Sequence, residues 1–172
     1  MRIKFYSTKR LSTLLFSKTC SLFIIAATLL TQSLYAQHDG KGNDPLFHAY
    51  LDIKDAFVSG DAVTASIKAG YFLKVLNETD SNSISQGNRN ALSKQSGSIA
   101  GFRDIKNQRE SFQSLSANMY LVVKSSKLSV SPIYYAYCPM KKAYWLSSEA
   151  VIKNPYYGSS MLTCGKVEET LK

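Results

Sequence analysis

The sequence predicts a mainly α protein, an antiparallel bundle of about four helices followed by a small, irregular C-terminal cap that contains a β-hairpin. Three observations predict it. Apolar residues recur at helical spacing in several segments between residues 44 and 127. Helix-capping residues precede most of these segments. Beyond Lys127 the chain becomes rich in β-branched and aromatic residues, which favour strands.

The first two helices are expected on either side of a tight turn. Asp44 and Pro45 supply a helix N-cap and the favoured first helical residue, and Gly60 ends the pattern. Asp61 caps a second helix that runs to about Asn77. The apolar positions of the two helices are Leu46, Tyr50, Ile53 and Phe57, then Ala62, Ala65, Ala69, Leu73 and Leu76. We therefore expect these two helices to pack antiparallel to each other.

A polar stretch separates this pair from the next helices. Residues 79–98 are rich in Ser, Asn, Gln and Gly, so we expect a loop and then a weak helix over about residues 88–100. Asp104 caps a longer fourth helix. Its apolar face consists of Ile105, Phe112, Leu115, Met119 and Val122.

The cap begins with a strand around Ile133–Tyr137, and a return strand is expected at Tyr144–Leu146. Pro139 must lie in a turn or at a sheet edge, because proline cannot donate a backbone hydrogen bond. Residues Met161–Gly165 are expected to form a compact element near the C-terminus.

The N-terminal segment reads as a secretory signal. Residues 1–36 hold five basic residues and no acid, then an apolar run, then small residues before a predicted cut near Ala36. The apolar run Leu22–Leu30 is about half the length that a membrane span needs, so we expect no span in the mature chain. The interpretation is a signal peptide (1–36), a flexible leader (37–43) and a single periplasmic or secreted domain (44–172), divided into a bundle (44–127) and a cap (128–172).

Composition narrows the classes of function. The signal segment takes five of the 21 basic residues and none of the 12 acidic ones, so the net charge falls from +9 to +4. No basic stripe interleaved with aromatics remains, so nucleic-acid binding is not expected. The chain has no nucleophile elbow, phosphate loop, zinc-protease motif or Cys-x-x-Cys, and an enzyme is not predicted.

Sulfur ligands gather in the cap. Cys138 lies two residues before Met140, and Met161 lies three residues before Cys164. Folding these segments together would join two thiolates and two thioethers, a set that selects Cu(I). Trp145 would then be a lid over the ion, because aromatic faces attract cations.

The same residues allow other interpretations. Cys138 and Cys164 would form a structural disulfide in an oxidising compartment, and methionines routinely fill cores. Trp145 equally suits a core, and the tyrosines of the cap suit a patch that binds another envelope protein. These tyrosines are Tyr134, Tyr135, Tyr137, Tyr144, Tyr156 and Tyr157.

Several motifs resemble one bacterial family, the domains of unknown function numbered 3347. They are Tyr50–Ala56, Gly60–Ala62, Asp104–Phe112, Tyr137–Met140, Trp145–Ser148, Ile152–Gly158 and Met161–Gly165. Similar domains occur as small secreted proteins and joined to periplasmic adaptors of heavy-metal efflux pumps. The resemblance implies handling of Cu(I) or Ag(I) and heavy-metal efflux components as partners.

Overall fold

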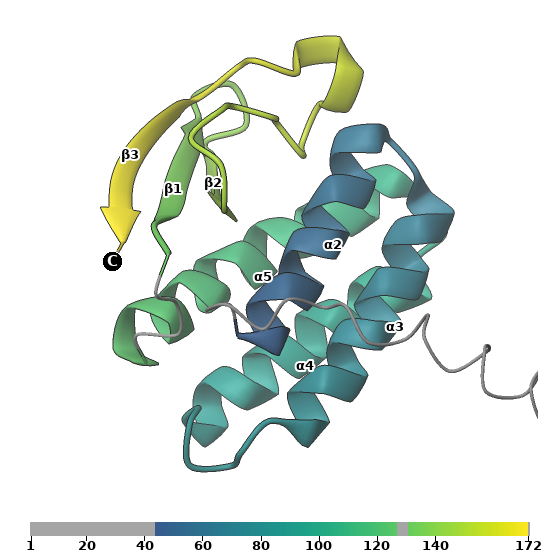
Figure 1. The fold of residues 1–172 in the computed structure, drawn as a ribbon. Coiled ribbons are helices and arrows are strands. Elements are labelled where there is room, and N and C mark those ends of the chain that lie inside the picture. The colour runs from purple at the N-terminus through teal and green to yellow at the C-terminus, as the bar shows by residue number, and fades with distance from the viewer. Residues whose placement is uncertain (1–43, 127–130, 172) are drawn as a thin grey trace, which may run out of the picture. The chain divides into compact units, whose positions relative to one another are not determined.

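A computed structural model describes residues 44–126 and 131–171. The predicted signal peptide and leader lie outside these residues. Residues 41–172 form one compact unit. In it, four helices form a bundle, and a three-stranded antiparallel sheet with a short 3-10 helix forms the C-terminal cap (Figure 1). The predicted fold class is therefore confirmed.

The four helices are α2 (Pro45–Ser59), α3 (Ala62–Glu78), α4 (Gln86–Gly101) and α5 (Ile105–Ser126). The predicted caps account for their starts. The Asp44 carboxylate accepts from the Leu46 backbone N–H at 2.7 Å, and Asp61 accepts from Thr64 at 2.9 Å. Gly60 ends α2 in a left-handed conformation with φ of 75°, which glycine adopts without strain. The polar helix α4 begins earlier than expected because Ser85 caps it.

The core of the bundle consists largely of the predicted apolar positions. Leu46, Tyr50, Ile53 and Phe57 of α2 are fully buried, and Phe112, Leu115 and Met119 of α5 pack in the same cluster. On α3, Ala62 and Leu73 are only half-buried, and Phe72 and Val75 complete its inner face. The bundle therefore supplies a rigid support for the cap.

The sheet has the order β2-β1-β3. The hairpin strands β1 (Ile133–Cys138) and β2 (Ala143–Ser147) match the expectation, with Cys138 opposite Ala143. Strand β3 (Lys166–Leu171) was not predicted, and it pairs with β1 so that Tyr137 lies opposite Lys166. The compact element expected at Met161–Gly165 is instead the end of the 3-10 helix η1 (Gly158–Met161) and the turn that leads into β3.

Buried hydrogen bonds attach the cap to the bundle. The Tyr50 hydroxyl on α2 accepts from the Leu146 backbone N–H on β2 at 3.0 Å and shares a 2.8 Å hydrogen bond with Ser116 on α5. Arg109 on α5 donates to the Phe57 carbonyl oxygen at 2.8 Å, and it lies beside Gly158 at the start of η1. The Tyr50 hydrogen bond joins β2 to the bundle, and Arg109 of the bundle lies beside the start of η1.

Among the residues that the structure describes, no helix has both the length and the apolar character needed to cross a membrane.

Candidate functional site

The two cysteines of the cap meet where β1 ends and β3 begins. Tyr137 pairs with Lys166, so the next residues outward on the two strands are Cys138 and Gly165, with Cys164 beyond them. The Cys138 thiol is a neighbour of the Cys164 thiol, and both cysteines are free. Burial is the largest cause that raises the pKa of the Cys164 thiol, and the Cys138 thiol adds to it. The cap thus brings two free thiols together.

A backbone N–H group of the β1–β2 turn points at the Cys138 sulfur: the Lys141 N–H donates to Cys138 Sγ at 3.4 Å. The backbone of Met140 lowers the pKa of the Cys164 thiol, in opposition to burial. The turn itself is closed by the Lys142 N–H, which donates to the Cys138 carbonyl oxygen at 2.8 Å. Donors of this kind favour the charged form of a sulfur.

The two cysteines differ in their access to solvent. Cys138 is completely buried, whereas Cys164 is half-buried. A ligand that reaches the pair from solvent therefore meets Cys164 first.

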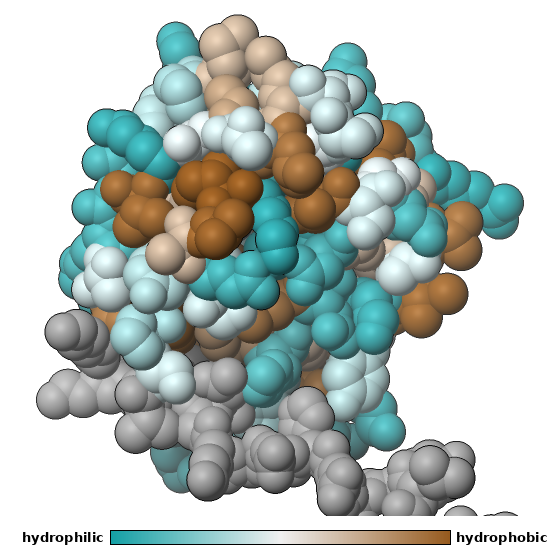
Figure 2. Space-filling view, turned by 45° about the horizontal axis from the view of Figure 1, so that its top comes forward, coloured by the Kyte–Doolittle hydropathy of each residue, from teal (hydrophilic) through white to brown (hydrophobic). Residues whose placement is uncertain are grey.

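The two methionines of the predicted set lie in the backbone turns that carry the thiols. Met140 lies in the β1–β2 turn after Cys138, and the Met161 carbonyl oxygen accepts from the Cys164 N–H at 3.0 Å. The side chain of Met140 is 61% exposed and that of Met161 is 37% exposed, so neither is a core residue. Figure 2 shows apolar side chains gathered on the end of the molecule that carries the cap.

Asn154 holds the segment that delivers Cys164. Its buried side chain donates to the Cys164 carbonyl oxygen at 2.7 Å and accepts from the Tyr156 N–H at 2.8 Å. Its own backbone N–H donates to the Leu162 carbonyl oxygen at 2.8 Å. Sequence analysis could not identify this role, because nothing in the spacing of Asn154 shows that its amide would reach across ten residues.

Trp145 lies beneath the thiol pair. It is 1% exposed, and its ring meets Tyr156 edge-on at a centroid distance of 6.2 Å. Gly165 leaves room for this ring, since a Cβ there would lie 2.8 Å from the edge of the indole. Trp145 is thus part of the core wall next to the residue that follows Cys164.

The donor set around the thiols is made of sulfur. Among the described residues, no group of three or more His, Cys, Asp or Glu side chains is placed to hold a metal ion. Two thiols with two nearby methionines suit a soft monovalent cation, whereas Mg²⁺ or Ca²⁺ would need oxygen ligands.

The tyrosines of the cap stack mainly on one another. Ring centroids are 4.1 Å apart for Tyr120 and Tyr135, 4.7 Å for Tyr135 and Tyr144, and 4.5 Å for Tyr144 and Tyr137. Burial is the largest cause that raises the pKa of Tyr135 to about 12. Tyr156, by contrast, is buried and packs on Phe112.

The fold and this geometry define a small helical-bundle protein whose sheet-containing cap carries a pair of thiols. The chain belongs to the family described as "Protein of unknown function (DUF3347)", which matches residues 46–131. The match covers all four helices and ends before β1, so the cysteines lie outside it. Neither a curated protein nor a solved structure matches the chain.

Proposed function

We propose that this is a periplasmic or secreted, non-catalytic protein that binds one soft monovalent cation, Cu(I) or Ag(I), in heavy-metal handling. Cys138 and Cys164 are the thiolate ligands, and Met140 and Met161 are the thioether ligands. The observation that carries the proposal is the pairing of β1 with β3, which brings Cys138 and Cys164 together as free thiols.

The surroundings of the pair support a cation site. A backbone N–H donor faces the buried Cys138 sulfur and offsets part of the cost of holding negative charge there. The bundle and Asn154 fix the two segments before an ion arrives, so little ordering is required on binding. Exposed Met140 and half-exposed Met161 are free to turn their flexible thioethers toward an ion that Cys164 has captured.

A non-catalytic role follows from the chemistry of the pair. Among the described residues, no histidine or carboxylate is hydrogen-bonded to either thiol to act as a base. The bound ion is therefore cargo, and heavy-metal efflux components are the proposed receivers.

The second candidate is a structural disulfide between Cys138 and Cys164 in an envelope interaction module. It is favoured by the same pair of neighbouring thiols, since oxidation would join the sulfurs without rearranging the strands. In that case Met140 and Met161 have no role, and this separates the two candidates.

A competition titration of Cu(I) and Ag(I) against a chelator, under anaerobic reducing conditions, tests the proposal. We expect Cys138→Ser and Cys164→Ser to abolish binding, and Met140→Leu or Met161→Leu to weaken it about tenfold or more, because each removes a soft ligand. Met119→Leu is the matched control, because Met119 is buried in the bundle. If all three Met→Leu variants bind the ion with equal affinity, Met140 and Met161 are not ligands. If the wild type does not bind the ion, the proposal is wrong.

A further inference from the structure

Helix α3 carries an apolar stripe on its solvent side. Val63, Ile67 and Tyr71 follow one another at intervals of four residues and are 71%, 66% and 51% exposed. The opposite face of α3 is already buried against the bundle through Ala65, Ala69 and Phe72. Single exposed apolar residues are ordinary, but the outer face of a surface helix is normally polar, so a row of three indicates a covered surface.

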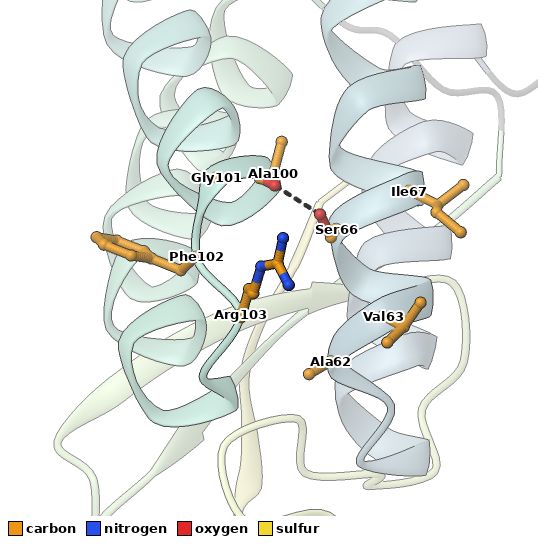
Figure 3. A pocket seen from close by; sticks show the side chains of 8 residues that line it. All are labelled: Ala62, Val63, Ser66, Ile67, Ala100, Gly101, Phe102 and Arg103. Atoms are coloured by element: carbon orange, nitrogen blue, oxygen red, sulfur yellow. Dashed lines mark hydrogen bonds between the residues drawn. The ribbon is translucent and has the colours of Figure 1, made fainter.

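The stripe borders a shallow groove of about 450 Å³ between α3 and the junction of α4 with α5. Figure 3 shows Ser66, Ala100 and Gly101 between the two helices, with Val63 and Ile67 on the α3 side and Phe102 on the other. The Ser66 hydroxyl donates to the Ala100 carbonyl oxygen at 2.5 Å, which closes the floor of the groove. Gly70, the residue before Tyr71, has open space where a side chain would stand. Arg103 projects between the two helices in the same view (Figure 3).

We infer that this stripe is the contact between two copies of the chain, α3 packing antiparallel on α3 across a two-fold axis at Ile67. The order of the residues carries the assignment. Val63 and Tyr71 lie four residues before and after Ile67, so the two-fold places Val63 of each copy against Tyr71 of the other. Ile67 packs on Ile67 at the centre.

The charges at the ends of the stripe agree with the same register. Asp61 lies six residues before Ile67, and Lys74 lies seven residues after it. In the dimer, Asp61 of each copy therefore faces the oppositely charged Lys74 of the other copy. The Asp61 carboxylate is held at the exposed start of α3 by the Thr64 N–H at 2.9 Å and the Thr64 hydroxyl at 2.6 Å. Lys74 is exposed, and its side-chain nitrogen is 3.9 Å from the Glu78 carboxylate. Such a weak surface ion pair can give way to a pair between Lys74 and Asp61 of the other copy. Antiparallel α3 helices also align their dipoles favourably.

A contact between two helices is small, so the dimer is weak. We expect a dissociation constant on the order of 100 µM, because interfaces below roughly 1,200 Å² are transient. The surface is separate from the thiol pair, and the inference does not depend on the proposed function.

Analytical ultracentrifugation tests the dimer with protein produced from the full-length coding sequence, over about 10 µM to 1 mM, which spans the expected constant. Ile67→Asp places two carboxylates face to face on the axis and should weaken association at least about tenfold. Leu121→Asp is the matched control, since Leu121 is a similarly exposed apolar residue on α5. Thermal unfolding of both variants checks that they fold. A wild type that stays monomeric, or equal effects of the two substitutions, overturns the inference.

A charge cycle tests the register independently. Lys74→Glu should weaken the dimer strongly, because the new carboxylate faces Asp61 of the other copy. Asp61→Asn keeps a good helix cap but removes the charge, so the double variant should recover part of the association lost in Lys74→Glu. If Lys74→Glu has the same effect in both backgrounds, Asp61 and Lys74 do not meet and the antiparallel pairing is wrong.

Discussion

Gly165 shows how a single residue shapes the thiol site. Its φ of 149° is one that residues with a side chain rarely adopt, and a Cβ would lie 2.9 Å from the Tyr137 carbonyl oxygen and 2.8 Å from Trp145. Only glycine lets the chain after Cys164 pass so close to β1. The approach of the two thiols therefore depends on a residue with no side chain.

Replacing Gly165 with alanine should destabilise the protein by about 2–3 kcal/mol, because strain at such a backbone position and the clash with Trp145 add together. Urea unfolding measures the change. Gly97→Ala is the control: a side chain there meets open space in the middle of α4, and the helix should gain about 1 kcal/mol. If the two substitutions change the free energy of unfolding equally, an alanine side chain at position 165 does not clash with Trp145.

At this scale the sequence indicates candidate chemistry more readily than geometry. A soft donor set could be predicted for the cap because Cys138-Pro139-Met140 and Met161–Cys164 are short patterns with a chemical meaning, and it stays a prediction. The roles of Asn154 and of the turn N–H groups could not, because they depend on how the backbone turns. Lys142 is an example: its φ of 56° closes the β1–β2 turn, and nothing in its side chain signals this.

The secondary-structure elements differ in how visible they are in the sequence. The helices were predicted because Asp44, Asp61 and Asp104 mark starts and because apolar spacing marks the buried faces. Strand β3 was missed because Lys166–Leu171 is a short, charged edge strand whose conformation is set by pairing with β1. Charged residues suit such an edge, since they discourage further strand pairing.

A polar cluster fastens β3 to the bundle. The Tyr120 hydroxyl on α5 donates to Glu169 at 2.7 Å, and Lys124 lies 3.2 Å from the same carboxylate. The hydrogen bond from Tyr120 is the largest cause that lowers the pKa of Glu169. A carboxyl group whose pKa is lowered on folding adds stability above its unfolded pKa and loses it as the pH falls through the folded value.

Attachment of β3 should therefore weaken in acid, below the ordinary pKa of a glutamate. Amide protection factors for β3, followed by hydrogen exchange between neutral and acidic pH, should fall in the wild type more than in Tyr120→Phe, which has already lost the hydrogen bond. Protection in β1, the central strand, is the internal reference. A β3 whose protection is equally insensitive to pH in both proteins would contradict this account of the cluster.

On the scale of the whole molecule, the bundle supports the cap. The family match ends at residue 131, whereas the thiol pair lies beyond it, in a cap that Tyr50 of the bundle holds through a buried hydrogen bond from the Leu146 N–H. Helical spacing predicted the bundle well, because each helix shows its buried face locally. The meeting of Cys138 with Cys164 depends on contacts far apart in the sequence, so the sequence alone left ligation and disulfide formation open.

Native mass spectrometry of the chain, prepared anaerobically with reductant and offered Cu(I) or Ag(I), tests the central claim most directly. Free thiols are counted in parallel by alkylation of metal-free protein prepared anaerobically without reductant. The account predicts one retained ion per chain, absent in Cys138→Ser, with Cys138 and Cys164 both alkylated in the metal-free sample. No retained ion, together with a metal-free chain in which Cys138 and Cys164 resist alkylation and the mass is two hydrogens lower, would contradict it and establish the disulfide instead.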